Sequence, residues 1–155
     1  MTTVIVYDSI FGNTASIARA IASARETEGA VRLLTPAEAK ALTFTPDDLL
    51  IVGSPTRGFS PTPAINEFIA GLAAAPAGLR AAAFDTRLAP ETVHPAPLRW
   101  VVEAGGYAAQ RIAEALRHKG FVVSAEEGGF AVLGTEGPLK PGEEARAQHW
   151  ATALH

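Results

Sequence analysis

The sequence contains no cysteine among its 155 residues. Without thiols the chain forms no disulfide, no cysteine-ligated zinc or iron–sulfur site and no thiolate nucleophile. Thirteen basic residues stand against 16 acidic ones, which leaves no basic stripe for nucleic acid and no acidic tail. No apolar run approaches the roughly 18–20 residues of a membrane span, and no signal-peptide pattern begins the chain, so we expect no membrane contact and a cytoplasmic location.

The composition is that of a folded protein. Hydrophobic residues make up 48% of the chain and charged residues 19%, which excludes a disordered chain. The length fits one domain, and no repeat or linker divides it. We therefore expect a single domain over residues 1–155.

Short apolar runs alternate with segments of helical spacing. The runs at 4–7, 49–52 and 79–84 are typical of strands buried on both faces, and weaker strands are predicted at 30–34, 121–123 and 130–133. Helical spacing predicts helices over 14–22, 65–72, 108–116 and 143–154. Thr35-Pro36-Ala37-Glu38 has the pattern of a capping box and predicts one further, short helix. This order predicts an α/β fold, a three-layer doubly wound domain with a five-stranded parallel sheet.

Polar or glycine-rich segments follow three of the predicted strands, at residues 8–14, 53–61 and 85–88. In such sheets ligands bind beyond the carboxyl ends of the strands. In the first segment, Gly12 allows close backbone approach, while Ser9 and Thr14 add hydroxyl donors beside the free amides of a helix start. The segment lacks Lys and Arg, which favours a phosphate monoester over a triphosphate. A capped helix start that binds nothing is the alternative.

Two longer motifs give a more specific signal. The first segment and the residues leading into it read Tyr7-Asp8-Ser9-Ile10-Phe11-Gly12-Asn13-Thr14. This stretch, with Ala18 and Ile21 after it, resembles the phosphate loop of flavodoxins. The second segment reads Gly53-Ser54-Pro55-Thr56-Arg57-Gly58-Phe59 and is similar to the corresponding loop of flavodoxin-like quinone reductases. The resemblance extends along nearly the whole chain and implies a flavodoxin-like sheet of strand order 2-1-3-4-5.

The resemblance also implies a cofactor, FMN, bound without a covalent bond between the three segments. The phosphate would be held by Ser9, Ile10, Phe11, Gly12, Asn13 and Thr14. The isoalloxazine ring would be flanked on one side by Pro55, Thr56, Arg57, Gly58 and Phe59, and on its other side or pyrimidine edge by Asp85, Thr86 and Arg87.

Two positions depart from the family pattern. Phe11 stands where flavodoxins usually place a hydroxyl residue. Flavodoxins also usually stack a tyrosine of the third loop on the flavin, whereas no aromatic residue directly follows Arg87; Trp100 and Tyr107 come later.

The resemblance implies an FMN-binding electron-transfer protein without catalytic or metal-binding residues of its own. Its partners would be redox proteins or a small-molecule electron donor or acceptor, and the chain would be a monomer or homodimer. The alternatives are an FMN-dependent NAD(P)H or quinone reductase, and a binding module whose FMN affinity is weak or lost. A cationic Arg57 or Arg87 facing the flavin would stabilise its reduced anion.

Overall fold

The structure is a computed structural model, and it describes residues 1–89 and 106–154. Helices separate most of the strands along this part of the chain, as the apolar spacing predicts. In chain order the elements are β1 Thr2–Tyr7, α1 Asn13–Arg25, β2 Ala30–Leu34, β3 Leu49–Pro55, α2 Pro63–Ala70, β4 Arg80–Leu88, α4 Ala108–His118, β5 Val122–Val123, β6 Gly128–Val132 and α5 Glu143–Thr152.

The strands form one parallel sheet in the order β2-β1-β3-β4-β5, with β6 also paired to β4. This confirms the expected α/β class and the order 2-1-3-4-5. The sheet has six strands rather than five because its last position is divided. The start of β4 pairs with β5 at Arg80 and Ala81, and its end pairs with β6 from Phe84 to Leu88.

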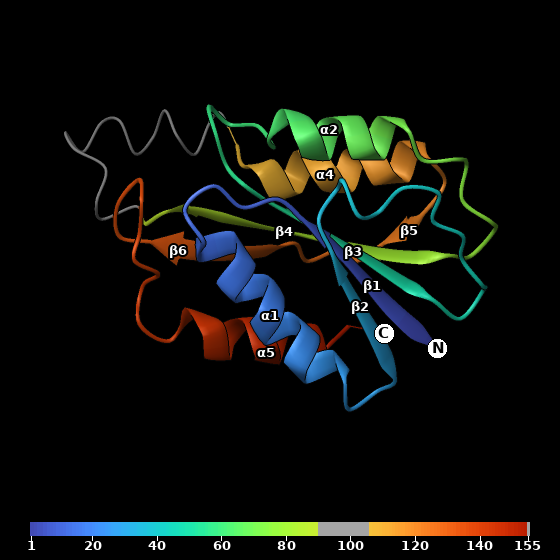
Figure 1. The fold of residues 1–155 in the computed structure, drawn as a ribbon, viewed down its shortest axis with the longest axis horizontal. Helices are drawn as coiled ribbons and strands as arrows, with labels where there is room; N and C mark the ends of the chain where they lie inside the picture. Colours follow the sequence, from blue (N-terminus) through green and yellow to red (C-terminus); the bar gives the residue numbers. More distant parts are fainter. Residues whose placement is uncertain (90–105, 155) are drawn as a thin grey trace.

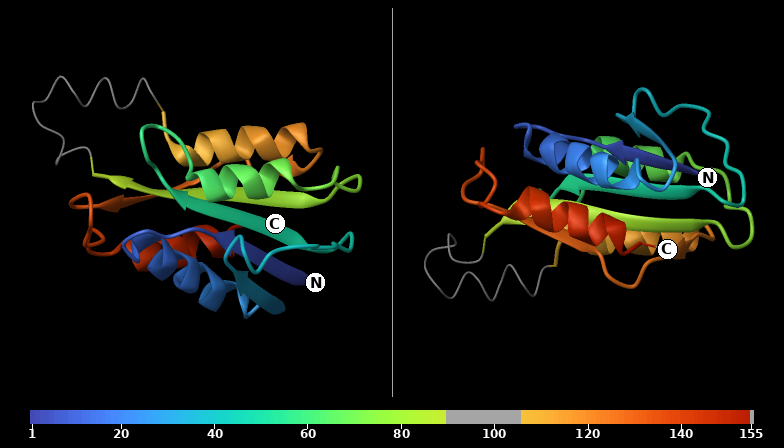
Figure 2. Two further views of the ribbon diagram at one scale, coloured as in Figure 1. Left: turned by 45° about the horizontal axis from the view of Figure 1, so that its top comes forward. Right: turned by 90° about the horizontal axis from the view of Figure 1, so that it is seen from below.

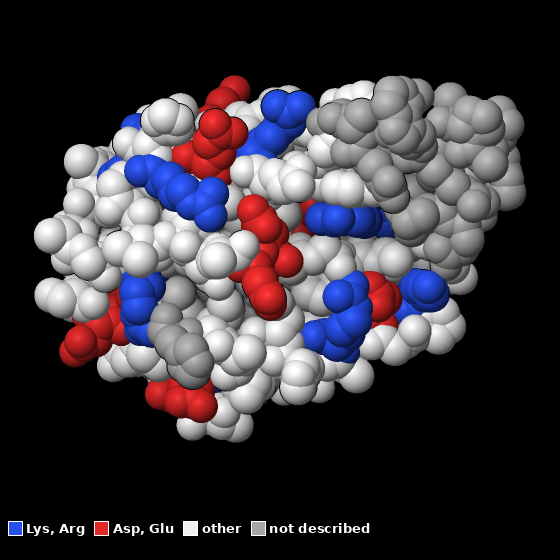
Figure 3. All heavy atoms as spheres, turned by 180° about the vertical axis from the view of Figure 1, so that it is seen from behind, with Lys and Arg blue, Asp and Glu red and all other residues white. Residues whose placement is uncertain are grey.

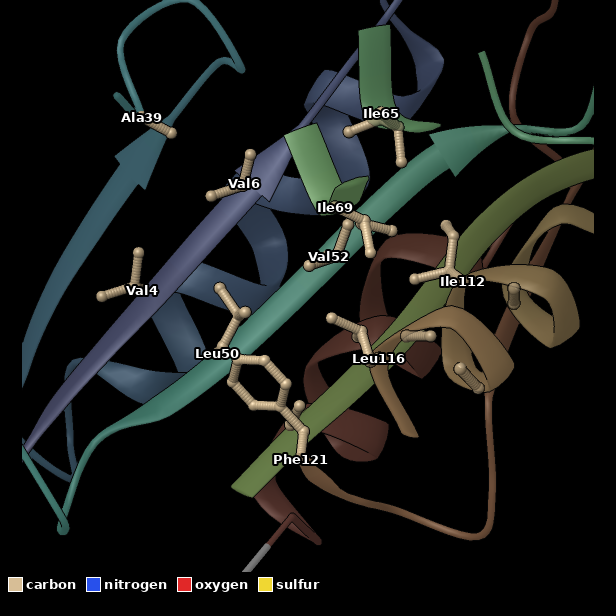
Figure 4. Close-up of a cluster of buried hydrophobic side chains, with 14 of the residues drawn as sticks. Val4, Val6, Ala39, Leu50, Val52, Ile65, Ile69, Ile112, Leu116 and Phe121 are labelled. Carbon is tan, nitrogen blue, oxygen red and sulfur yellow. The ribbon is translucent and has the colours of Figure 1, made fainter. Parts of the chain in front are cut away.

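Helices cover both faces of the sheet, with α1 and α5 on one face and α2 and α4 on the other (Figures 1 and 2). Side chains of successive strand residues point to opposite faces. Ile5 therefore packs in the core beside α1 and α5, whereas Val6 and Val52 pack in the core beside α2 and α4 shown in Figure 4. Both faces of the central strands are buried, which explains why they appear in the sequence as continuous apolar runs.

A buried arginine joins the two helices of one face. Arg25 ends α1, is 2% exposed, and donates from Nη1 to the carbonyl oxygens of Ala151 and Leu154, each at 3.2 Å. The last carbonyls of a helix lack intrahelical donors. Arg25 satisfies two carbonyls at the end of α5 and so fixes the two helices against each other.

The short helix predicted after Thr35 is absent, and this prediction was wrong. The backbone N–H and the hydroxyl of Thr35 do donate to Glu38 Oε1, at 2.9 and 3.0 Å, but residues 36–38 form only a turn. A helix of one or two turns fixes more backbone freedom than its few hydrogen bonds offset.

The two central strands extend further than their apolar runs. β3 continues to Pro55 and β4 to Leu88, so the polar residues expected in loops after these strands begin within the sheet. The register places Tyr7 beside Gly53, Gly53 beside Phe84 and Phe84 beside Gly128. The carboxyl ends of β1, β3, β4 and β6 therefore meet at one edge.

Within the described ranges no helix is long and apolar enough to cross a membrane. The face in Figure 3, opposite to that of Figure 1, shows basic and acidic side chains close to one another rather than gathered by sign.

Candidate functional site

A cavity of about 160 Å³ opens at the carboxyl edge of the sheet. Its wall combines the loop after β1, the ends of β3 and β4, and the end of β6. The lining residues are Ile10, Phe11, Asn13, Thr14, Pro55, Thr56, Arg57, Gly58, Thr86, Arg87, Leu88, Val132 and Thr135. Segments far apart in sequence thus meet where a ligand of a doubly wound sheet is expected.

The loop after β1 arranges the backbone N–H groups at the start of α1. Ser9 Oγ accepts the amide N–H groups of Gly12 and Ala15 at 3.1 and 3.2 Å, and Gly12 has a left-handed backbone with φ of 95°. The first α-helical bond of α1 runs from Ser16 N–H to the Gly12 carbonyl. Among the described residues, no acceptor takes the amides of Asn13 and Thr14. These two donors at a helix N-terminus suit an anion.

A hydroxyl pair ties this loop to β4. Thr14 Oγ1 and Thr86 Oγ1 lie 2.7 Å apart, and both side chains are buried. Thr86 precedes the residues at the end of β4 that line the cavity. The start of α1 and the end of β4 are therefore held in fixed relative positions.

The segment after β3 is a tight turn. Arg57 and Ser60 exchange two backbone hydrogen bonds, of 2.8 and 3.0 Å, around Gly58 and Phe59. Both central residues have positive φ, 54° and 67°, as a type I′ turn requires. The Phe59 carbonyl accepts a hydrogen bond of 2.6 Å from Arg111 Nε of α4, and Phe59 does not line the cavity.

Asp85 faces α4 rather than the cavity. Its carboxylate is fully buried, pairs with Arg87 through bonds of 2.7 and 2.8 Å, and accepts the Ala109 amide at 2.9 Å. The Thr56 hydroxyl donates to the same carboxylate and accepts the Ala108 amide at 3.0 Å. Burial raises the pKa of the Asp85 carboxyl from its ordinary value, while the bonds from Arg87, Ala109 and Thr56 oppose that rise. Thr56 and Asp85 thus cap the first turn of α4.

Arg87 is fixed in the wall of the cavity. Its Cζ atom lies 3.7 Å from the centroid of the Tyr107 ring. A Cβ atom at Gly129 would lie 2.5 Å from the same carbon, so only glycine at 129 leaves room for the guanidinium. Tyr107 therefore lies against Arg87 at the end of β4, but it does not line the cavity.

The charged lining residues are both arginines. Arg57 and Arg87 line the cavity, and its described wall contains no Asp or Glu. The apolar members Ile10, Phe11 and Leu88 are 50%, 45% and 39% exposed. The rim is thus apolar and cationic, which suits a flat aromatic ligand with an anionic group.

The residues present fit FMN. The free amides of Asn13 and Thr14 suit a phosphate monoester, and the loop from Ser9 to Thr14 brings no carboxylate against it. The cavity is smaller than the roughly 300–1,000 Å³ of most small-molecule sites. Two exposed side chains narrow it, because Arg57 Cζ lies 5.9 Å from the Phe11 ring centroid. Exposed side chains change rotamer within nanoseconds, so their movement widens the space for the ring.

Most residues predicted for the site lie together. Those that line the cavity are Ile10, Phe11, Asn13, Thr14, Pro55, Thr56, Arg57, Gly58, Thr86 and Arg87. Ser9 and Gly12 shape the loop from behind, whereas Phe59 and Asp85 are engaged with α4. The predicted set lacks Leu88, Val132 and Thr135; the apolar run at 130–133 was the signal for a further strand end at this edge. Trp100 lies outside the described residues.

Comparisons with known proteins agree with this arrangement. A Flavodoxin domain family model matches residues 4–93. Flavodoxin 1 from Bacillus cereus is similar over 100% of both chains, with 18% identity and a TM-score of 0.69. A Fusobacterium nucleatum flavodoxin mutant bound to flavin mononucleotide matches over 97% of this chain and 93% of its own, with 15% identity and a TM-score of 0.63.

A longer protein contains a similar unit. The flavodiiron protein from Giardia intestinalis matches over 99% of this chain, with 21% identity and a TM-score of 0.70, and this chain spans 35% of its length. No curated protein matches the sequence. Because the family model covers more than half of the sequence, from β1 through β4, the chain belongs to the flavodoxin family of FMN-binding electron-transfer proteins.

Proposed function

We propose that this chain carries electrons between separate redox partners with FMN seated at the carboxyl edge of the sheet. The cofactor-binding residues would be those predicted from the three segments, Ser9–Thr14, Pro55–Phe59 and Asp85–Arg87, joined by Leu88, Val132 and Thr135. The convergence of the loop after β1, the end of β3 and the end of β4 on one cavity carries this proposal.

The phosphate would be bound by the start of α1. The amides of Asn13 and Thr14 point to no protein acceptor among the described residues, and the helix dipole adds partial positive charge. Ser9 Oγ accepts the neighbouring amides of Gly12 and Ala15, and these two hydrogen bonds fix the conformation of the loop. Neutral donors of this kind suit a terminal monoester.

The ring would lie between the 57–60 turn and the end of β4. Bound FMN would accept and release electrons, and the protein would orient it and set its potentials. Thr14 and Thr86 hold the phosphate loop at a constant distance from the end of β4, and Asp85 fixes Arg87 beside it. The exposed Ile10 and Leu88 at the rim leave a path to a partner.

Binding is tested with purified protein, its absorption spectrum and a fluorescence titration with FMN. We expect FMN to bind at least about tenfold more tightly than riboflavin, because only FMN can use the phosphate loop. Gly12→Ala should weaken FMN binding, since a Cβ at φ of 95° strains the loop.

Gly142→Ala is the matched control for this titration. Gly142 has the same left-handed conformation, φ of 89°, at the N-cap of α5, and does not line the cavity. Equal affinities for FMN and riboflavin would contradict the proposed phosphate site. A colourless protein that binds neither would instead favour a module that has lost its flavin.

A reductase is the second candidate. Phe11 is the one aromatic residue in the described wall of the cavity, so no described aromatic lid shields the proposed ring position from a small substrate. Oxidation of NAD(P)H with a quinone acceptor distinguishes the two functions. Steady turnover by the FMN-loaded protein would favour the reductase, and reduction only by a partner protein would favour the carrier.

The remaining expectations concern the setting of this carrier. We propose that residues 1–155 act as one unit, as a monomer or homodimer in the cytoplasm, without nucleic acid or membrane as a partner. On the face in Figure 3 the basic and acidic side chains are interspersed. The described residues of that face therefore offer no patch of positive charge to which a nucleic acid or an anionic membrane would bind. A sedimentation measurement tests the oligomeric state.

A further inference from the structure

We infer that Arg57 raises the reduction potential of the bound flavin above the value that the flavin would have in this site without the positive charge. The inference rests on the proposed function, since it concerns the same site. It follows from how differently the two arginines of the cavity wall are held.

Arg87 contributes little net charge. Its guanidinium makes two bonds to the buried carboxylate of Asp85, at 2.7 and 2.8 Å, and its side chain is 23% exposed. The pair lies between Tyr107 and Gly129, which keeps the two opposite charges together. At the distance of the cavity, the field of Arg87 is largely cancelled by that of Asp85.

Arg57 is held without a carboxylate. It lines the cavity, its side chain is exposed, and no ion pair joins it to an acidic group within the described part of the chain. Its backbone is fixed by the two hydrogen bonds to Ser60, and its guanidinium lies 5.9 Å from the Phe11 ring. The anchored backbone keeps this uncompensated positive charge near the mouth of the cavity even as the exposed side chain changes rotamer.

Such a charge acts differently on the two forms of the cofactor. Full reduction would add two electrons and one proton to the neutral oxidised ring, and so would leave one negative charge on the flavin. A cation at the cavity mouth therefore favours the reduced form. Because the guanidinium is exposed and water screens it, we expect a threefold to tenfold effect on the ratio of the two affinities. For this two-electron reduction the ratio corresponds to a change in midpoint potential of about 14–30 mV.

The test compares Arg57→Gln, Arg57→Lys and Arg117→Gln with the unmodified protein, each loaded with FMN. Arg117 is an exposed arginine in the last turn of α4, the end of the helix away from Tyr107, and serves as a matched loss of charge. Potentials are measured by titration with a reductant and reference dyes. The affinity for oxidised FMN is measured separately by fluorescence.

We expect Arg57→Gln to lower the potential for full reduction by about 14–30 mV, while Arg57→Lys and Arg117→Gln leave it unchanged. In Arg57→Gln the affinity for reduced FMN should fall threefold to tenfold more than the affinity for oxidised FMN, whereas in Arg117→Gln neither affinity should change. The shift in Arg57→Gln should also shrink as the salt concentration rises.

Equal potentials in Arg57→Gln and the unmodified protein would overturn the inference, as would an equal shift in Arg117→Gln. In both cases normal FMN binding would leave the proposed function standing. Failure of the unmodified protein to bind FMN would overturn the proposed function itself, and this outcome is already visible in the fluorescence titration.

Discussion

Residue 53 decides where the Phe84 ring lies. Phe84 is fully buried and packs edge-on against Phe130 and Trp150, at centroid distances of 6.5 and 6.3 Å. A Cβ atom at Gly53 would lie 2.0 Å from the Phe84 ring. A glycine in the middle of a central strand usually weakens the strand, but here it makes room for the aromatic cluster below the sheet.

Gly53→Ala should therefore destabilise the fold by about 1–3 kcal/mol, because the Phe84 ring must leave its position. The change is measured as the free energy of unfolding in urea. Gly71→Ala is the control. At Gly71 a Cβ would lie 3.4 Å from its nearest neighbour and φ is −81°, so that variant should be neutral or slightly more stable. Similar losses in both variants would contradict the role given to Gly53.

A second single residue, Phe11, is expected to affect how tightly FMN binds. It is 45% exposed and stands where the family usually has a hydroxyl. Phe11→Thr should add a donor to the phosphate loop and tighten FMN binding about tenfold, or about 1.4 kcal/mol. The affinity is measured by fluorescence titration.

Phe11→Leu is the control, since it removes the ring and its contact with Arg57 but adds no donor. A gain of the same size in both variants would assign the effect to space rather than to the hydroxyl. No gain in Phe11→Thr would mean that position 11 lies beyond reach of the phosphate.

At the scale of elements, Glu143 joins α5 to β6. Its carboxylate is bonded to Arg146 Nη2 at 2.7 Å and accepts the Ala131 amide at 2.6 Å. The hydrogen bond from Arg146 and that from Ala131 hold the pKa of the Glu143 carboxyl below its ordinary value of 4.5, against the opposing effect of burial. A lowered pKa in the folded state means that ionised Glu143 stabilises the fold above about pH 4.5.

Glu143→Gln should cost about 1–3 kcal/mol at pH 7. The difference from the unmodified protein should shrink as the pH falls below 4.5 through the folded-state pKa of Glu143, where the carboxyl is protonated. Urea unfolding across this range measures it. Glu144→Gln, at the exposed neighbour, should stay within about 0.5 kcal/mol at every pH. A constant difference for Glu143→Gln would exclude the ionised carboxylate as its cause.

The same scale shows which elements the sequence can predict. Continuous apolar runs predict β1 and β3 because both faces of these strands are buried. The polar residues 85–87 suggest a loop, yet they lie in β4. Asp85 can be buried there because it accepts the Ala109 amide of α4, and Arg87 fits because Gly129 has no side chain. Such partners are distant in sequence, and no local pattern indicates them.

At the scale of the whole molecule, the position of the site follows from topology. Parallel strands bring their carboxyl ends to one edge, so three polar segments could be placed together from sequence alone. The sequence did not predict that Val132 and Thr135 line the cavity. They reach it because β6 pairs with the end of β4, in the part of the sheet beyond β5. Asp85 and Phe59 contact α4 instead of the cavity, through hydrogen bonds to residues far away in the sequence, and the sequence pattern does not indicate such bonds.

The ion pair between Glu143 and Arg146 has a second consequence, for self-association. β6 lies beside β4 at the outer part of the sheet, where a free strand edge invites another chain to add a strand. Its Ala131 amide is taken by Glu143, its Gly129 carbonyl by Arg146 and its Ala131 carbonyl by the Lys140 amide. These contacts engage main-chain groups of β6 with which another chain would have to pair, so they hinder the addition of a strand at this edge of the sheet.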